Sequence, residues 1–267
     1  LSNTTLTLVS FYLLALAIPA FLDWAFLSSQ ISGNTRFDCK AKGACWAWVD
    51  QRFGQFLFGF YPESERWRVI LTFILLFPAL IPWLTQGLPG QRYLRWFSVA
   101  YPAIATILLA GGLGLQEVPT DKFGGFMLNL IVGLSGIVLS LPVGVLLALG
   151  RQSKLPLIRW LSIGFIEAIR GVPLITLLFV SNILLPIFLP PDMTLDSIVR
   201  VIIMVTAFAS AYMAEVIRGG LQAIPSGQIE AAHAMGLNYW KSMRLIVLPQ
   251  ALRISIPGIV NTFIGLF

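Results

Sequence analysis

The chain has 267 residues, of which 57% are hydrophobic and only 11% are charged. Soluble globular domains carry about 25% charged residues, so this composition excludes a surface made mainly for water. The formal net charge of +6 comes from basic residues scattered through short connections, which argues against nucleic-acid binding and is typical of membrane proteins. We therefore predict an all-α fold, a polytopic transmembrane helical bundle.

Seven long apolar stretches follow one another, each near the roughly 20 residues that a helix needs to cross a bilayer. They are residues 6–26, 67–84, 96–115, 124–149, 157–186, 197–217 and 249–267. The fifth contains Glu167, Arg170 and Pro173, so we expect it to be bent or broken. The seventh is cut off at Phe267, and the chain begins at Leu1 without a Met, so we expect both ends to be incomplete.

The connections between these stretches alternate in charge. Three are rich in Lys and Arg: 85–95, 150–160 and 218–248. The other three are acidic or mixed: 27–66, 116–123 and 187–197. In the last of these, Asp192 and Asp196 have no compensating cation. Because Lys and Arg accumulate in cytoplasmic loops, we predict a cytoplasmic N-terminus and an external segment 27–66.

Two cysteines, Cys39 and Cys45, lie in the longest polar segment. If that segment faces an oxidising compartment, the pair can close a small disulfide loop. The alternative is two free thiols near the membrane surface. The surrounding segment has no histidine and no further cysteine, so we expect no metal site.

Residues 225–236 predict a short amphipathic helix on the cytoplasmic side, between the last two stretches. Gly236 is a natural helix terminator. Ile229, Ala232 and Gly236 recur at spacings of three and four and therefore share one face. Their small size would let another protein approach the backbone closely. On amphipathicity alone, the favoured interpretation is an interfacial helix that merely connects two membrane spans.

The sequence of this segment resembles the EAA signature of ABC importer permeases: E-A-A, three residues, Gly, nine residues, then I-x-L-P. Here it reads Glu230-Ala231-Ala232, Gly236 and Ile246-Val247-Leu248-Pro249. In that family the short helix is the coupling helix, which docks in a groove of the ATP-binding subunit. The resemblance implies that the residues contacting the ATPase here are Glu230, Ala231, Ala232, His233 and Gly236.

Three further elements are similar to the polar amino-acid uptake subfamily of these permeases. They are E-A-I-R-G-V-P-L at 167–174, A-Y-M-A-E-V-I-R-G-G at 211–220 and L-P-Q-A-L-R at 248–253. Val172 stands where the subfamily usually has Thr. The cysteine loop and residues 61–68 resemble the larger permeases of general L-amino-acid importers.

The resemblance implies a type I ABC importer-like fold in two parts. Residues 1–123 would form an N-terminal membrane extension with three transmembrane helices and the external loop 27–66, and residues 124–267 the permease core. The chain would sit in the bacterial inner membrane and translocate L-amino acids. Implied partners are ABC ATPase subunits, a second homologous permease, a periplasmic amino-acid-binding protein and membrane lipid.

No G-x-x-x-x-G-K-[ST] phosphate loop is present, so we expect this chain to hold no cofactor and its partner ATPase to bind ATP and Mg. The main alternative is a secondary amino-acid transporter driven by an ion gradient, which predicts an internal repeat and does not explain the EAA spacing. An intramembrane enzyme would need a catalytic constellation that the sequence lacks.

Ionisable residues inside a span by default mark a transport pathway or an ion pair. Glu215 is our first candidate for the substrate ammonium, with Tyr212 on the same face; its alternative is an ion pair with Arg218 or another helix. Asn129 is a candidate cavity residue or a helix–helix hydrogen bond. Arg170 is expected to pair with Glu167 three residues earlier or, alternatively, to take the substrate carboxylate. The substrate-binding candidates are thus Glu215, Tyr212, Asn129 and Arg170.

Overall fold

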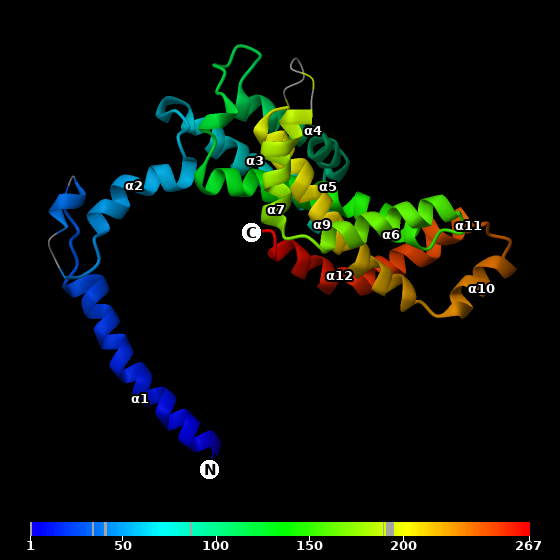
Figure 1. Ribbon diagram of the computed structural model, residues 1–267, viewed down its shortest axis with the longest axis horizontal. Coiled ribbons are helices and arrows are strands. Elements are labelled where there is room, and N and C mark those ends of the chain that lie inside the picture. The colour runs from blue at the N-terminus through cyan, green and yellow to red at the C-terminus, as the bar shows by residue number, and fades with distance from the viewer. Residues whose placement is uncertain (1, 34, 40–41, 86, 189, 191–194) are drawn as a thin grey trace.

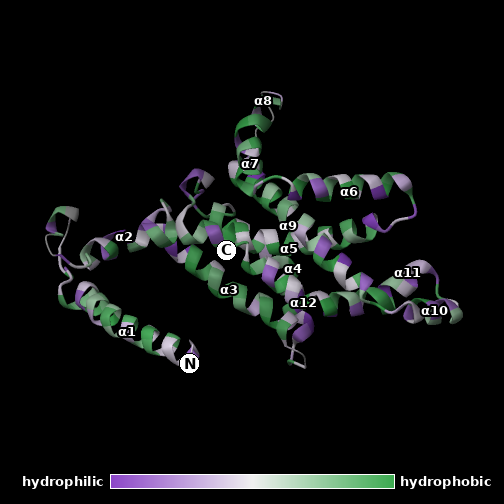
Figure 2. Ribbon diagram, turned by 60° about the horizontal axis from the view of Figure 1, so that its bottom comes forward, coloured by the Kyte–Doolittle hydropathy of each residue, from purple (hydrophilic) through white to green (hydrophobic). Residues whose placement is uncertain are grey.

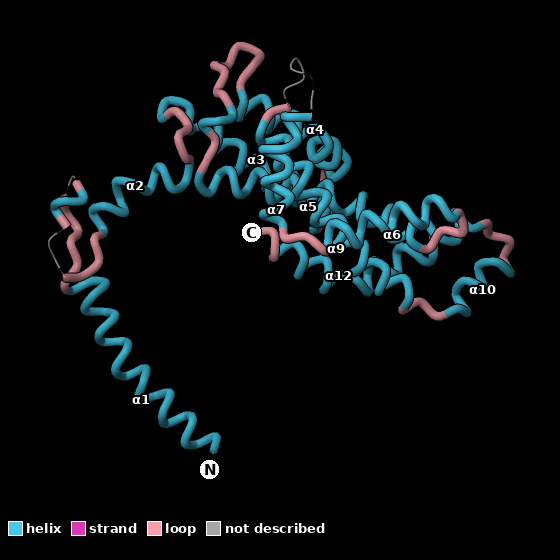
Figure 3. The backbone as a smooth tube through the Cα atoms, in the orientation of Figure 1, coloured by secondary structure: helices cyan, strands magenta, loops and turns pink. Residues whose placement is uncertain are grey.

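The computed structural model describes residues 2–33, 35–39, 42–85, 87–188, 190 and 195–267. These residues form helices joined by loops, with two isolated β-bridges and no strand within the described ranges (Figure 3). The predicted all-α class is confirmed. Asp192, which supported the predicted orientation, lies outside the described residues.

Six helical segments of the described chain are long and apolar enough to cross a membrane, and a bent helix pair makes a seventh if its two parts form one span (Figure 1). Their helices are α1 (Ser2–Leu22) with the π turn η1 (Asp23–Leu27), α3 (Arg66–Leu84), α4 (Gln91–Ala110), α5 (Gly125–Arg151), α9 (Ser197–Gln222) and α12 (Leu248–Ile264). Hydrophobic residues dominate α1, α3 and α5 (Figure 2). Each helix corresponds to one predicted apolar stretch.

Two helices begin earlier than the hydropathy predicted. Helix α4 starts at Gln91, so that Arg92 and Arg95, expected in a connection, lie in its first turns. The last span starts at Tyr239 through α11 (Tyr239–Ser242) and the π turn η6 (Met243–Val247), ahead of Pro249. A proline lacks the N–H that an α-helical bond requires, and the wider π turn before Pro249 accommodates this loss.

The fifth stretch is broken as predicted. It divides into α6 (Pro156–Arg170) and a second piece made of α7 (Leu174–Phe179), η5 (Val180–Leu184) and α8 (Leu185–Phe188), with a bend of 103°. The break falls at Gly171-Val172-Pro173, because the residue before a proline is driven out of the α-helical region. Arg170 therefore ends α6 and lies at the bend.

Helices α5, α9 and α12 cross closely because glycines lie at the contacts. A Cβ on Gly144 of α5 would come within 2.7 Å of the Met213 side chain on α9. A Cβ on Gly220 of α9 would lie 2.5 Å from the Ala251 carbonyl oxygen of α12. Lipid provides no hydrophobic drive for helix association, so such close van der Waals packing is what holds membrane helices together.

One cluster of buried side chains, here called the main core, joins five elements at the end of the bundle that carries the EAA sequence. Its members are Ala148, Ile166, Met213, Ala214, Ile217, Leu221, Ile224, Val247 and Ala251. It contains residues from α5, α6, α9, η6 and α12, so these elements form one packed unit.

The N-terminal part is attached to this unit at the opposite end of the bundle. A second cluster, made of Tyr61, Val69, Leu109, Val118 and Met127, joins α3, α4 and α5. The fully buried Arg68 binds Glu65 at 2.9 Å and donates to the Gln116 carbonyl at 3.0 Å. Helix α2 (Trp46–Phe58) links α1 to this cluster, and Cys39 forms a disulfide with Cys45 just before α2 begins.

Candidate functional site

Helix α10 (Ser226–Ala234) carries the E-A-A sequence between α9 and the last span. Pro225 precedes its first turn, and Gly236 ends it with φ +73°, a conformation that glycine adopts without steric cost. The Gly236 N–H donates to the His233 carbonyl, and the Leu237 N–H donates to the Ala232 carbonyl. This pair of bonds is the Schellman ending, so the predicted terminator role of Gly236 is confirmed.

Helix α10 is exposed on most of its surface and buried at one position. Glu230, Ala231, His233 and Gly236 are exposed, whereas the side chain of Ala232 is 1% exposed. Because α10 packs its Ala232 side against α11 and η6, this side chain is closed to a partner. The expectation that Ala232 is a contact residue is therefore corrected: its small size lets α10 lie close to this chain itself.

The position of α10 is fixed on both sides by membrane helices. Ile224, just before α10, is buried in the main core together with Leu221 of α9 and Val247 of η6. Gln250 of α12 reaches the Gln228 side chain of α10 at 3.5 Å. A displacement of α10 would therefore be passed to α9 and α12 together.

Five charged residues meet where α5, α6 and α9 come together near the same end of the bundle. This charged cluster consists of Arg151, Glu167, Arg170, Glu215 and Arg218. Its centre is Glu215, whose carboxylate is 2.7 Å from Arg151, 2.9 Å from Arg218 and 3.8 Å from Arg170. The alternative prediction for Glu215 is an ion pair with Arg218 or with another helix, and the structure shows contacts of both kinds.

The favoured pairing of Glu167 with Arg170 is wrong. Glu167 instead lies 3.5 Å from Arg151, and Arg170 turns toward Glu215. The guanidinium of Arg170 also lies over the Tyr212 ring, 5.3 Å from its centroid. Because α6 ends at Arg170, this side chain is free to leave the helix surface and reach α9, which an i,i+3 argument within one helix could not anticipate.

The cluster has an excess of positive charge. Three arginines oppose two glutamates, leaving one net positive charge. Arg151 and Arg170 end α5 and α6, where the partial negative charge of a helix C-terminus stabilises cations. Glu215 has a side-chain exposure of 16%, against 41% for Arg170. The most exposed members of the cluster are thus the Glu167 carboxylate, at 63%, and the Arg170 guanidinium, which is its most exposed cation.

The four substrate candidates fall into two places. Glu215, Tyr212 and Arg170 come together in or beside the charged cluster. Asn129 is exposed near the start of α5, 22 residues before Arg151 and thus about 33 Å away along the helix.

Arg151 was missed by the sequence analysis because it was counted as a loop residue. Its place just after a long apolar stretch is the signal that could have found it.

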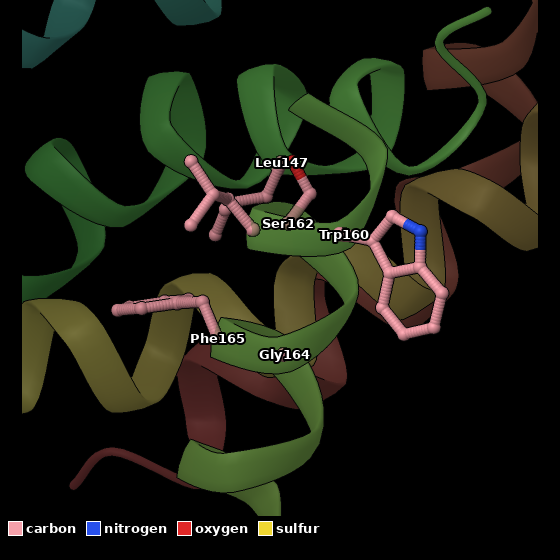
Figure 4. Close-up of a pocket in the computed structure, with 6 residues that line it drawn as sticks. Leu147, Trp160, Ser162, Gly164 and Phe165 are labelled. Carbon is pink, nitrogen blue, oxygen red and sulfur yellow. The ribbon is translucent and has the colours of Figure 1, made fainter. Parts of the chain in front are cut away.

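A separate hollow of about 540 Å³ lies between α5 and α6. It is lined by Leu147, Trp160, Leu161, Ser162, Gly164 and Phe165. Figure 4 shows Trp160 and Phe165 extending to opposite sides of α6. Its lining contains none of the charged residues that an amino acid requires, so we do not assign it to substrate.

Comparison with known proteins places this arrangement in a family. The family described as binding-protein-dependent transport system inner membrane component matches residues 140–267, which include the charged cluster and α10. A solved chain titled crystal structure of an amino acid ABC transporter with histidines is 30% identical, with a TM-score of 0.46, over 52% of this chain and 64% of that chain.

Two curated relatives match almost the whole chain. The inner membrane amino-acid ABC transporter permease protein YhdY of Escherichia coli K12 is 47% identical over 100% of this chain and 73% of its own length. The glutamate/glutamine/aspartate/asparagine transport system permease protein BztC of Rhodobacter capsulatus is 43% identical over 99% of this chain and 76% of its own. The chain therefore belongs to the binding-protein-dependent transport system inner membrane components, among the amino-acid ABC transporter permeases.

Proposed function

We propose that this chain is the transmembrane subunit of an ATP-driven importer of L-amino acids, and that α10 is its coupling helix. The observation that carries the proposal is the E-A-A…G…I-x-L-P sequence on an exposed helix that the main core ties to α9 and α12. A motor that moves α10 would move these two spans with it, and this is what opening one side of a transport pathway requires.

The proposal assigns the energy source to separate subunits. Two ATPase subunits bind ATP and Mg, and one of them docks on Glu230, Ala231, His233 and Gly236, which are exposed on α10. A second homologous permease completes the pathway, and a periplasmic binding protein delivers the amino acid. The basic connections near α10 favour a cytoplasmic position for this end, and we therefore propose a cytoplasmic N-terminus and an external disulfide loop.

For the substrate we propose that Arg170 receives the α-carboxylate. Arg170 is the most exposed arginine of the cluster, and its pair with Glu215 is the longest, at 3.8 Å. It lies at the break of a span, over the Tyr212 ring, where a bound anion is held beside irregular backbone and away from lipid. The three guanidinium groups around Glu215 offset its repulsion of a bound carboxylate, and Glu215 serves to position Arg170.

This assignment replaces the expected contact between Glu215 and the substrate ammonium, because an ammonium approaching Glu215 would have to join three cations. Replacing Arg170 by Gln should raise the KM for uptake by roughly tenfold, the cost of one charge-assisted hydrogen bond. Replacing the control residue Arg218, which is occupied by Glu215 and Gln222, should change KM less. Equal KM in both variants would contradict the assignment of Arg170.

Docking of α10 is tested by crosslinking in the assembled transporter. Cysteines placed at Glu230 and His233 should crosslink to the ATPase, whereas a cysteine at the buried Ala232 should react far less. The native cysteines are paired in a disulfide and do not interfere. No crosslink from any of these positions to an ATPase would refute the coupling assignment.

Bulk at the end of α10 provides a second test. Gly236 has open space around it in this chain but a φ of +73°. Gly236→Ala introduces the backbone strain alone, about 1–2 kcal/mol, and should leave partial transport. Gly236→Trp adds a large side chain to the docking surface and should abolish it while the chain still assembles.

The ion-gradient alternative is separated by the energy source. In reconstituted vesicles the proposal predicts amino-acid uptake that requires ATP and the loaded binding protein. Uptake that follows an imposed ion gradient without ATP would overturn it.

A further inference from the structure

Helix α2 is too short to cross a bilayer, yet it carries a continuous exposed apolar stripe. Its 13 residues span about 20 Å, against the roughly 30 Å of a bilayer core. Trp46, Val49, Phe53 and Phe56 follow at spacings of three, four and three and so line one side. Each is between 41% and 63% exposed.

Opposite the stripe, α2 carries Gln51, Gln55 and the buried Ala47, while Arg52 lies at the edge of the stripe. Arg52 donates to the Gln55 side chain at 2.8 Å and stacks on Trp48 at 4.7 Å. Gln51 donates to the Gly33 carbonyl of the disulfide loop at 3.1 Å. The side of α2 that carries Gln51 therefore faces the disulfide loop, and the exposed aromatic stripe faces away from it.

The start of α2 is fixed to the end of α1. The Trp46 indole N–H donates to the Ala25 carbonyl at 2.5 Å, and the Ala44 N–H donates to the Trp24 carbonyl at 2.8 Å. The disulfide between Cys39 and Cys45 closes the loop directly before this point. The first turn of α2 therefore lies at the level where the first membrane span ends.

The end of α2 is fixed at the start of α5. A Cβ on Gly59 would lie 2.4 Å from the Gly124 Cα atom, and the Phe60 N–H donates to the Lys122 carbonyl at 3.2 Å. Figure 1 shows α2 leading from the end of α1 to the rest of the molecule. Because these span ends belong to one side of the bilayer, α2 connects two points of the same membrane surface.

We infer that α2 lies flat on the external face of the inner membrane, with Trp46, Val49, Phe53 and Phe56 inserted among lipid headgroups and upper acyl chains. The stripe continues the lipid-facing surface of the adjoining spans, where Trp24 and Trp67 are also half exposed at the span ends. Tryptophan and phenylalanine at this depth are typical of interfacial helices, which insert about 5–10 Å below the headgroup level.

The interfacial position of α2 is independent of how the transporter is energised. A helix held in this way would keep α1 at a distance of about 20 Å from the α3–α5 junction. It would thereby anchor the disulfide loop to the bilayer.

The test uses the full transporter complex in nanodiscs of phosphatidylethanolamine and phosphatidylglycerol. A spin label is attached to a cysteine at Phe53, with Phe56 as a second position and Gln51 on the polar side as the matched control. Power saturation of the EPR signal measures how often the spin label collides with each of two reagents. Oxygen concentrates in lipid, whereas a nickel chelate stays in water. Both faces of a nanodisc are accessible, so the result does not depend on the proposed orientation.

We expect the oxygen-to-nickel ratio at 53 and 56 to exceed that at 51 by roughly tenfold, as for a helix with one face in lipid. Equal exposure of 53 and 51 to nickel would place α2 in water and overturn the inference. Protection of 53 and 56 from both reagents would show that a protein surface covers the stripe, and would overturn it as well. Failure of ATP-driven transport in the same samples would contradict the proposed function and leave the position of α2 unaffected.

Discussion

The first span and the fourth span are similar in hydropathy and opposite in packing. The segment Ser2–Leu27 has a mean hydropathy of 2.1 and no buried residue in its most apolar window, whereas Gly125–Arg151 has 2.5 and 22% buried. The first span contains no glycine, and the fourth span contains five. Hydropathy thus identifies which segments enter the membrane, and small residues identify which of them meet another helix of the same chain.

The same contrast separates the two halves of the molecule. In the C-terminal half, the crossings of α5, α9 and α12 and the charged cluster hold the helices together. In the N-terminal half, α3 and α4 pair through side-chain bonds from Ser98 to the Ala79 carbonyl and from Tyr101 to the Thr72 carbonyl. The half that we propose to transmit movement of α10 is the one whose helices are packed closely against one another.

The largest effect is expected at the crossing of α9 and α12. Gly220→Leu would force a side chain into a place where even a Cβ lies 2.1 Å from the Ser255 hydroxyl oxygen. We expect a loss of about 3 kcal/mol or more and little assembled complex, measured by size-exclusion yield and thermal unfolding. Gly219→Leu is the control, because nothing lies within 4 Å of its Cβ. Equal yields for the two variants would show that the crossing is not close-packed.

The next largest effect concerns the charged cluster. Glu215→Gln leaves three guanidinium groups without their shared carboxylate, so we expect destabilisation of about 3 kcal/mol in thermal unfolding of the complex. Glu167→Gln removes one pair of a carboxylate that is 63% exposed and should cost below about 1 kcal/mol. If both variants unfold alike, the cluster does not hold α5, α6 and α9 together.

Much of this fold could be predicted from the sequence, since hydropathy records what the bilayer requires of each span. The seven crossings and the break at Pro173 follow from run length and from proline sterics. The helix starts at Gln91 and Tyr239 could not be obtained in this way. Helices continue beyond the apolar layer wherever their backbone bonds are satisfied, and hydropathy does not record this.

The site was predictable where it depends on one helix and not where it depends on several. The ending at Gly236 follows from local backbone chemistry. The burial of Ala232 depends on η6 packing beneath it, and the contacts of Glu215 depend on where α5 and α6 end. Arg151 and Arg170 are 19 residues apart in sequence, and only the close approach of three helices brings them to one carboxylate.

The disulfide should matter less, and only in the N-terminal half. Replacing Cys39 and Cys45 by Ser opens a loop of seven residues, which the loop-entropy relation values at about 2 kcal/mol for the segment that it closes. We expect faster proteolytic cleavage between residues 27 and 45, with thermal unfolding of the C-terminal half and uptake kinetics unchanged. A fall in uptake would show that the halves are coupled more strongly than their packing indicates.

The smallest effect is expected in the first span, and it tests the comparison most directly. Leu13 is 58% exposed on α1, so Leu13→Ala exchanges one lipid contact for another and should change stability by less than about 0.5 kcal/mol. Ile217→Ala, in the main core, leaves a cavity and should cost about 2–5 kcal/mol. Both are measured by thermal unfolding of the complex in nanodiscs. If Leu13→Ala proved as costly as Ile217→Ala, α1 would be packed against another subunit, and its lack of glycine would no longer distinguish lipid-facing from protein-facing spans.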